Sequence, residues 1–146
     1  ISKCMKIISH NPEKIKCIQS GIIGIKNGVK VNEQVHFYRS INEFKKLCME
    51  RSPVNTPTVV FHKSLWPIFQ CRPALTSNNL PIGGPEDYDQ YCNLADNDIF
   101  IYPVNTCLGY FYRWHPEQHT WKVHQSSLLK QYENIIQDYW KKKWTL

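Results

Sequence analysis

The chain has 146 residues, of which 42% are hydrophobic and 13% aromatic, and its formal net charge is +6. This length and apolar content suit one globular domain spanning residues 1–146, and they exclude an intrinsically disordered chain. No apolar run approaches the roughly 18 residues that a membrane span needs. Because the chain begins at Ile1 and not at Met, we expect a trimmed ectodomain whose signal or anchor lies outside it.

Positive and negative charges are separated along the chain. Residues 1–31 contain six Lys and one Glu, whereas residues 73–112 contain five acidic residues and no Lys or Arg. A net positive charge suits nucleic acid or an acidic membrane surface. The separation of the two signs favours protein contacts at least as strongly.

The first elements predicted are a basic segment and two hairpin strands. Residues 1–13 are basic, end in a turn at Asn11-Pro12 and carry Cys4, a possible tether. Residues 15–20 read as a strand. Asn27-Gly28 is a strong hairpin signal between residues 22–25 and 29–31.

Residues 34–39 alternate like a further strand, with Val35 and Phe37 on one side and His36 and Tyr38 on the other. Ser40 and Glu43 then form an S-x-x-E capping box, which predicts the start of a helix. One face of this helix points into the core and carries Ile41, Phe44, Leu47 and Cys48. The helix should end before Ser52-Pro53.

The second half of the chain contains a loop-rich segment between predicted strands. Residues 58–62 form a β-branched apolar run, which predicts a buried strand, and residues 64–70 suit a helical turn. Residues 72–97 read as a long irregular segment pinned by Cys92. Residues 98–104 again read as a strand.

An aromatic hairpin and a long helix close the chain. Residues 107–114 and 120–124 predict the hairpin, in which Tyr110, Tyr112 and Trp114 share one face and Phe111 and Arg113 the other. From Ser126 an amphipathic helix carries apolar residues at helical spacing. These elements predict an α+β fold: a small antiparallel sheet, a short capped helix and a long C-terminal amphipathic helix.

Six cysteines, an even number without a C-x-x-C pair, favour disulfides over a zinc site: Cys4, Cys17, Cys48, Cys71, Cys92 and Cys107. Their spacing alone does not choose among the possible pairings. Six reduced, mostly buried thiols are the alternative.

Candidate chemistry is sparse. His115, His119 and His124 lie around one hairpin, but carboxylate or thiolate ligands at tight spacing are missing, so we predict neither a metal nor a cofactor. Gly83-Gly84-Pro85 lacks the spacing and the Lys of a phosphate-binding loop. A Cys–His nucleophilic pair, or acid–base catalysis by Glu86, Asp87 and Asp89, is less favoured than bridged cysteines and a solvated loop. A small hydrolase built on His and carboxylate side chains remains an alternative.

Two groups of residues are candidates for binding a protein partner: the acidic Glu86, Asp87 and Asp89, expected in an exposed loop, and the aromatic Tyr112 and Trp114. The aromatic hairpin, together with Arg113 and Lys122, would also suit stacking of bases or sugars. A basic nucleic-acid-binding or ribonucleoprotein subunit is therefore a second alternative.

Residues 14–73 resemble the ectodomain of a small single-anchor subunit of the poxvirus entry-fusion complex. The resemblance lies in Lys16-Cys17-Ile18, a Gly-containing hairpin, Arg39-Ser40-Ile41 with Phe44 leading to Cys48, and an apolar strand followed by Cys71 and Pro73. Small anchored ectodomains with paired cysteines also occur among the oral infectivity factors of insect large DNA viruses.

This resemblance implies a Cys17–Cys48 disulfide and a bond from Cys71 to a later cysteine such as Cys92, which leaves Cys4 and Cys107 as an extra pair. Cys4, Cys107 and the aromatic C-terminal part have no counterpart in that pattern. The resemblance also implies a viral envelope location and a role in virus entry.

The leading hypothesis is thus a non-enzymatic, disulfide-stapled ectodomain. It would be a subunit of a membrane-anchored protein assembly, on the virion envelope or the extracellular face of a membrane. Its expected partners are other protein subunits of that complex, with no small-molecule substrate.

Overall fold

A ten-residue strand, β1 (Cys17–Lys26), is the central strand of the sheet. The computed structural model describes residues 2–70, 85–118 and 127–145. Its other elements are α1 (Ser2–His10), β2 (Val29–Gln34), α2 (Ile41–Cys48), η1 (Thr56–Thr58), β3 (Val60–Phe61), η2 (Lys63–Leu65), α4 (Glu86–Asp96), β4 (Ile101–Trp114) and α6 (Ser127–Trp144). The fold is α+β, as predicted.

The sheet is mixed, not antiparallel as expected. β2 and β3 pair antiparallel with the two ends of β1. β4 pairs with β1 in parallel along its whole length, from Cys17 opposite Ile101 to Lys26 opposite Trp114. Two register shifts near Gly21 accommodate the extra residues of β4. A parallel pair needs a long connection, which here contains most of the helices.

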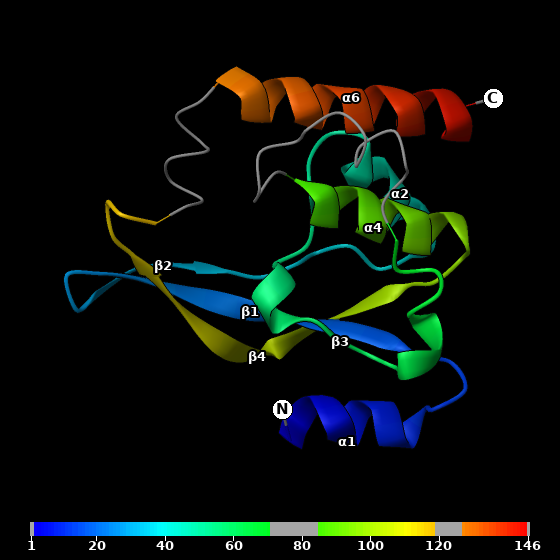
Figure 1. Cartoon of the computed structure of the whole chain (residues 1–146). Helices are drawn as coiled ribbons and strands as arrows, with labels where there is room; N and C mark the ends of the chain where they lie inside the picture. The colour runs from blue at the N-terminus through cyan, green and yellow to red at the C-terminus, as the bar shows by residue number, and fades with distance from the viewer. Residues whose placement is uncertain (1, 71–84, 119–126, 146) are drawn as a thin grey trace.

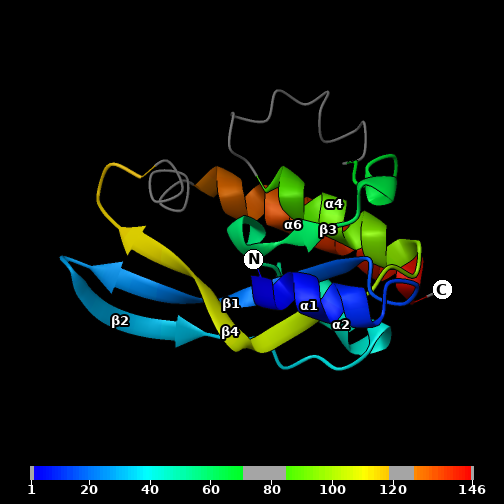
Figure 2. The same cartoon turned by 90° about the horizontal axis from the view of Figure 1, so that it is seen from below.

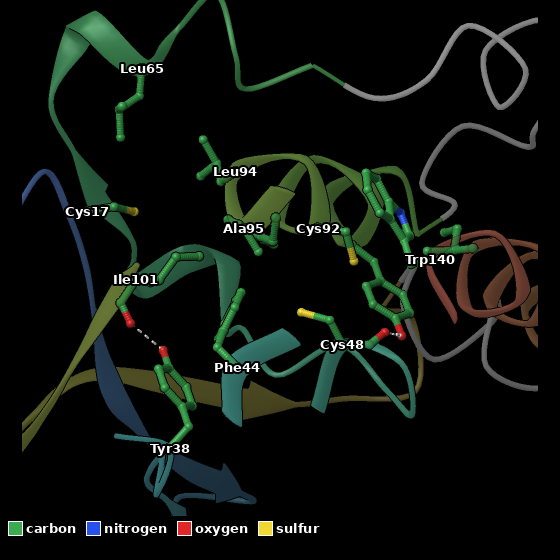
Figure 3. Close-up of a cluster of buried hydrophobic side chains, with 13 residues drawn as sticks. Cys17, Tyr38, Phe44, Cys48, Leu65, Cys92, Leu94, Ala95, Ile101 and Trp140 are labelled. Carbon is green, nitrogen blue, oxygen red and sulfur yellow. Dashed lines mark hydrogen bonds between the residues drawn. The ribbon is translucent and has the colours of Figure 1, made fainter. Parts of the chain in front are cut away.

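Helices lie on both faces of the sheet. α2, α4 and α6 cover one face, and α1 lies alone on the other (Figures 1 and 2). The main core between the sheet and the three helices contains fully buried side chains such as Phe44, Tyr88 and Trp140. Figure 3 shows part of this core, including the hydrogen bond from the Tyr38 hydroxyl to the Ile101 carbonyl (2.7 Å).

The two strongest local signals are confirmed. Asn27 and Gly28 have φ values of 52° and 78°, the left-handed backbone of a tight β1–β2 turn. Ser40 Oγ accepts from the Glu43 amide at 3.2 Å, and α2 begins at Ile41. The Glu43 carboxylate accepts from the Arg39 amide (2.7 Å).

The prediction of a strand over residues 34–39 is wrong beyond Gln34, where β2 ends. The alternation itself is present, but the side chains with polar groups face inward. His36 and Tyr38 are buried, whereas Phe37 is 80% exposed. The buried strand over residues 58–62 is reduced to the half-buried Val60 and Phe61 of β3.

The loop expected over residues 72–97 is also wrong in its second half, where α4 spans Glu86–Asp96. Residues 71–84 lie outside the described part. α4 forms because its apolar side chains recur at helical spacing and are buried: Tyr88, Tyr91, Cys92, Leu94 and Ala95. Acidic residues in its first turn face the positive end of the helix dipole.

The strands predicted over residues 98–104 and 107–114 form one continuous strand, β4. Residues 120–124, the second half of the expected aromatic hairpin, lie outside the described residues. The long C-terminal helix is confirmed as α6, with Ile136 and Trp140 buried. Ile135 and Tyr139, from the same apolar stripe, remain 47% and 42% exposed. Of the helices that the structure describes, none has the length and apolarity to cross a bilayer.

Candidate functional site

Three aromatic side chains, Tyr110, Tyr112 and Trp114, form a row along one face of β4. Their ring centroids are 6.5 Å apart between the two tyrosines and 5.0 Å apart between Tyr112 and Trp114. Tyr110 is 38% exposed, and the other two are half-buried. The predicted sharing of one face is confirmed, and we call these residues the aromatic row.

The aromatic row lies on the end of the sheet that extends past α1, α2 and α4 (Figure 1). It pairs with Ile22, Gly24 and Lys26 of β1. A methyl group added to Gly24 would lie 1.9 Å from Asn32 Oδ1 and 3.1 Å from Trp114 Nε1. The glycine therefore leaves the space that the Asn32 amide and the Trp114 indole occupy above β1.

A cavity of about 590 Å³ lies at the Trp114 end of the row. Its lining residues combine aromatic, amide and basic groups without a carboxylate: Lys26, Asn27, Val31, Asn32, Trp114, His115 and Pro116. Val31 is 52% exposed. The row and this cavity form one continuous surface with an apolar centre and a polar, basic rim.

The opposite face of the projecting sheet is also apolar. Phe111 is 61% exposed and pairs with Ile23, while the exposed Arg113 pairs with Ile25. Side chains alternate between faces along a strand, so these residues point away from the aromatic row. The exposed Phe111 and the aromatic row therefore lie on opposite faces of the same sheet end.

The acidic residues predicted to bind a partner occupy different environments, because they belong to α4 and not to an exposed loop. Asp89 is fully buried and accepts a hydrogen bond from Trp140 Nε1 at 2.8 Å, which makes it a core residue. Asp87 accepts from the Thr56 hydroxyl (2.5 Å), which links α4 to η1. The structure brings Tyr112 and Trp114 together, and it does not place the acidic residues beside them.

A buried polar network, not predicted from the sequence, lies at the other end of the sheet. Gln19 Nε2 donates to the Tyr38 hydroxyl (2.6 Å) and to the Pro53 carbonyl (3.1 Å), and its Oε1 accepts from the Asn55 amide (3.0 Å). Burial raises the pKa of Tyr38, so it stays a neutral phenol. The members come from four segments, and the only sequence signal is a Gln within an apolar strand.

His36 belongs to the same network. Its ring Nε2 lies 3.1 Å from Asn55 Nδ2, and the ring also hydrogen-bonds the Ser20 backbone. Burial lowers the pKa of His36, and the nearby Arg51 lowers it further. A cavity of about 370 Å³ borders this histidine. With Nε2 beside the Asn55 amide and the ring bonded to the Ser20 backbone, His36 joins β1 to the segment that contains Asn55.

Five cysteines are described, and the structure forms no disulfide among them. Cys17 and Cys48 both lie in the main core with zero exposure, and burial raises the pKa of Cys17 to about 12. Cys4 and Cys107 meet in a second cluster beneath α1. Cys92 lies in the main core, and Cys71 lies outside the described residues. The disulfide staple therefore stays a prediction.

Within the described part of the chain, no three His, Cys, Asp or Glu side chains form a group that would hold a metal ion. His119 and His124 lie outside that part. In comparisons with known proteins, the chain matches no family model, no curated protein and no solved structure.

Proposed function

We propose that this chain is a protein-binding subunit of a membrane-anchored assembly, and that its docking surface is the projecting sheet end with the aromatic row. The observation that carries this proposal is the aromatic row itself, in which Tyr110 is exposed and Trp114 lines a cavity. Tyr, Trp and Arg are the residues most enriched at the energetic centres of protein interfaces. All three types occur here on one short stretch of β4.

The surroundings of the row match the anatomy of an interface. An apolar centre, made of the three rings and Val31, is bordered by the polar Asn32 and the basic Lys26. A polar rim around an apolar centre is what protein interfaces show. The described residues that line the cavity include a lysine and no carboxylate, which favours a partner that presents acidic groups at its edge.

Two further parts of the proposal rest on the resemblance of residues 14–73 to a poxvirus entry-fusion subunit. They are the location on a virion envelope or another extracellular membrane face, and the role in virus entry. An even cysteine number agrees with such an oxidising location.

The test isolates the tagged chain, with its anchor, from its native membrane in mild detergent and quantifies the proteins that co-purify. We expect a stoichiometric complex with other membrane-anchored subunits, and at least a tenfold loss in the Tyr112→Ala/Trp114→Ala variant because both lie at the predicted centre of the interface. Trp66→Ala is the matched control, since Trp66 is 61% exposed at the C-terminal cap of η2, away from the row. A chain that stays monomeric, or equal losses in both variants, would reject the proposal.

Single-stranded nucleic acid is the second candidate ligand, because the row offers stacking platforms near Lys26 and the net charge is +6. Steeply salt-dependent binding of a labelled oligonucleotide, lost on Trp114→Ala, would favour it. No binding at low salt would remove it.

A further inference from the structure

Helix α1 is held against the sheet by few side chains. Cys4 is buried, and Ile7 and Ile8 are half-buried; together they pack on Ile18 of β1 and Val104 of β4. The rest of α1 is exposed, and the other α-helices that the structure describes lie on the opposite face of the sheet (Figures 1 and 2). A helix of nine residues is not stable alone, so its position depends on this small contact.

The contact contains two cysteines that lie far apart in the sequence. Cys4 is 4% exposed in α1, and Cys107 packs against the same cluster from β4. Burial raises the pKa of the Cys4 thiol, and the nearby Cys107 raises it further. Cys107 is half-buried, which leaves it open to a reagent in solution. The two side chains therefore belong to one cluster between α1 and the sheet, and Cys107 is the more exposed of the two.

We propose that Cys4 and Cys107 form a disulfide that fastens α1 across β4. Both thiols lose a proton as the sulfur–sulfur bond forms. The two electrons pass to an external disulfide such as oxidised glutathione, whose own sulfur–sulfur bond breaks to give two thiols. This proposal rests on the extracellular part of the proposed function, because such bonds persist in oxidising compartments.

A Cys4–Cys107 bond would determine how much of the sheet face beside the aromatic row stays covered by α1. Ile18, Ile22 and Gly24 alternate onto one face of β1, and Ile22 and Gly24 pair with Tyr110 and Tyr112 of the aromatic row. This face of the sheet therefore has two halves: α1 covers the half at Ile18, and the aromatic row lies on the other half. Fastening α1 keeps Ile18 and Val104 covered, so that only the projecting half is available to a partner.

The first measurement is peptide mapping of the chain isolated from an oxidising compartment, with free thiols blocked by N-ethylmaleimide before digestion. We expect the peptides that contain Cys4 and Cys107 to be joined and to separate on reduction. Alkylation of both in the folded protein, or a bond from either to another cysteine, would overturn the proposal.

The second measurement is hydrogen exchange of the α1 amides. Dithiothreitol should speed their exchange about tenfold or more in the wild type, because it releases the helix. In the Cys4→Ser/Cys107→Ser variant, exchange of the α1 amides should already be fast, and dithiothreitol should not change it. This variant is the control for effects of dithiothreitol on any other disulfide of the chain. Unchanged exchange in the reduced wild type would contradict the proposal, and this arm needs no variant to fold.

The two proposals fail in different ways. An absent Cys4–Cys107 bond, with partner binding still dependent on Tyr112 and Trp114, rejects the disulfide alone. A present bond with no dependence on those aromatics rejects the docking surface alone.

Discussion

At the scale of single residues, Gly21 is a position where any side chain meets the backbone. A methyl group there would lie 2.7 Å from the Gln34 carbonyl oxygen and 2.8 Å from a Leu108 methyl carbon. Gly21→Ala should therefore lower the free energy of unfolding by about 1–3 kcal/mol, the usual cost of overpacking. Urea denaturation monitored by circular dichroism measures this change.

Gly24→Ala is the matched comparison. Its closest obstacle is the amide end of Asn32, an exposed side chain that is able to move. The loss should be smaller than for Gly21→Ala, and Asn32→Ala should recover part of it. Equal losses at the two glycines would contradict this account of the sheet.

His36 gives the fold a pH dependence. Its pKa is lowered in the folded state, so the unfolded chain binds more protons as the pH falls below about 6.5. The stability that the neutral ring provides is complete above that pH and is lost as the pH falls towards the folded pKa. Wild type should lose more stability between pH 7.5 and pH 5.5 than His36→Gln. Parallel losses in the two proteins would reject this role.

For single residues, the sequence predicts which side chains share a face better than it predicts which face is buried. The alternation of residues 35–38 was correct, but it does not say which side faces the core. Hydrophobicity alone would bury Phe37, yet Phe37 is 80% exposed while Tyr38 is buried. The cause is tertiary, because Gln19 and the Ile101 carbonyl supply the hydrogen bonds that make a buried Tyr38 favourable.

At the scale of elements, the capping box determines the start of α2. Ser40→Ala should lower the free energy of unfolding by about 0.5–2 kcal/mol, because the Glu43 amide loses its acceptor. Ser40→Asp keeps an acceptor and should retain most of the stability. Thermal unfolding of the three proteins measures both effects. A loss as large for Asp as for Ala would show that the cap is not the cause.

Elements with local signals were predictable, and those fixed by distant contacts were not. Asn27-Gly28 and Ser40 with Glu43 encode their turn and cap within a few residues. The aromatic row followed from simple alternation along the strand. The glycines and prolines that precede α4 favour a loop, although Tyr88, Tyr91, Cys92 and Ala95 have helical spacing. The parallel pairing of β4 has no local signal at all.

At the scale of the whole molecule, the two halves of β1 have different protection. Residues 17–20 lie between helices on both faces, whereas residues 22–26 belong to the projecting end (Figure 1). We expect the amides of residues 22–26 to exchange about tenfold or more faster, through local opening that spares the core. Native-state hydrogen exchange with peptide resolution measures this ratio. Uniform protection along β1 would show that the projecting end is as rigid as the rest.

The parallel pairing of β1 with β4 has a consequence for how the chain is made. Cys17 pairs with Ile101, so the ribosome must add about 80 residues after the start of β1 before its main partner begins to emerge. At about 5–20 residues per second this takes several seconds. During that time the isoleucines of β1 have only α1, the β2 hairpin and the two-residue β3 to cover them. The nascent chain is therefore expected to need a chaperone that shields β1 until β4 is complete.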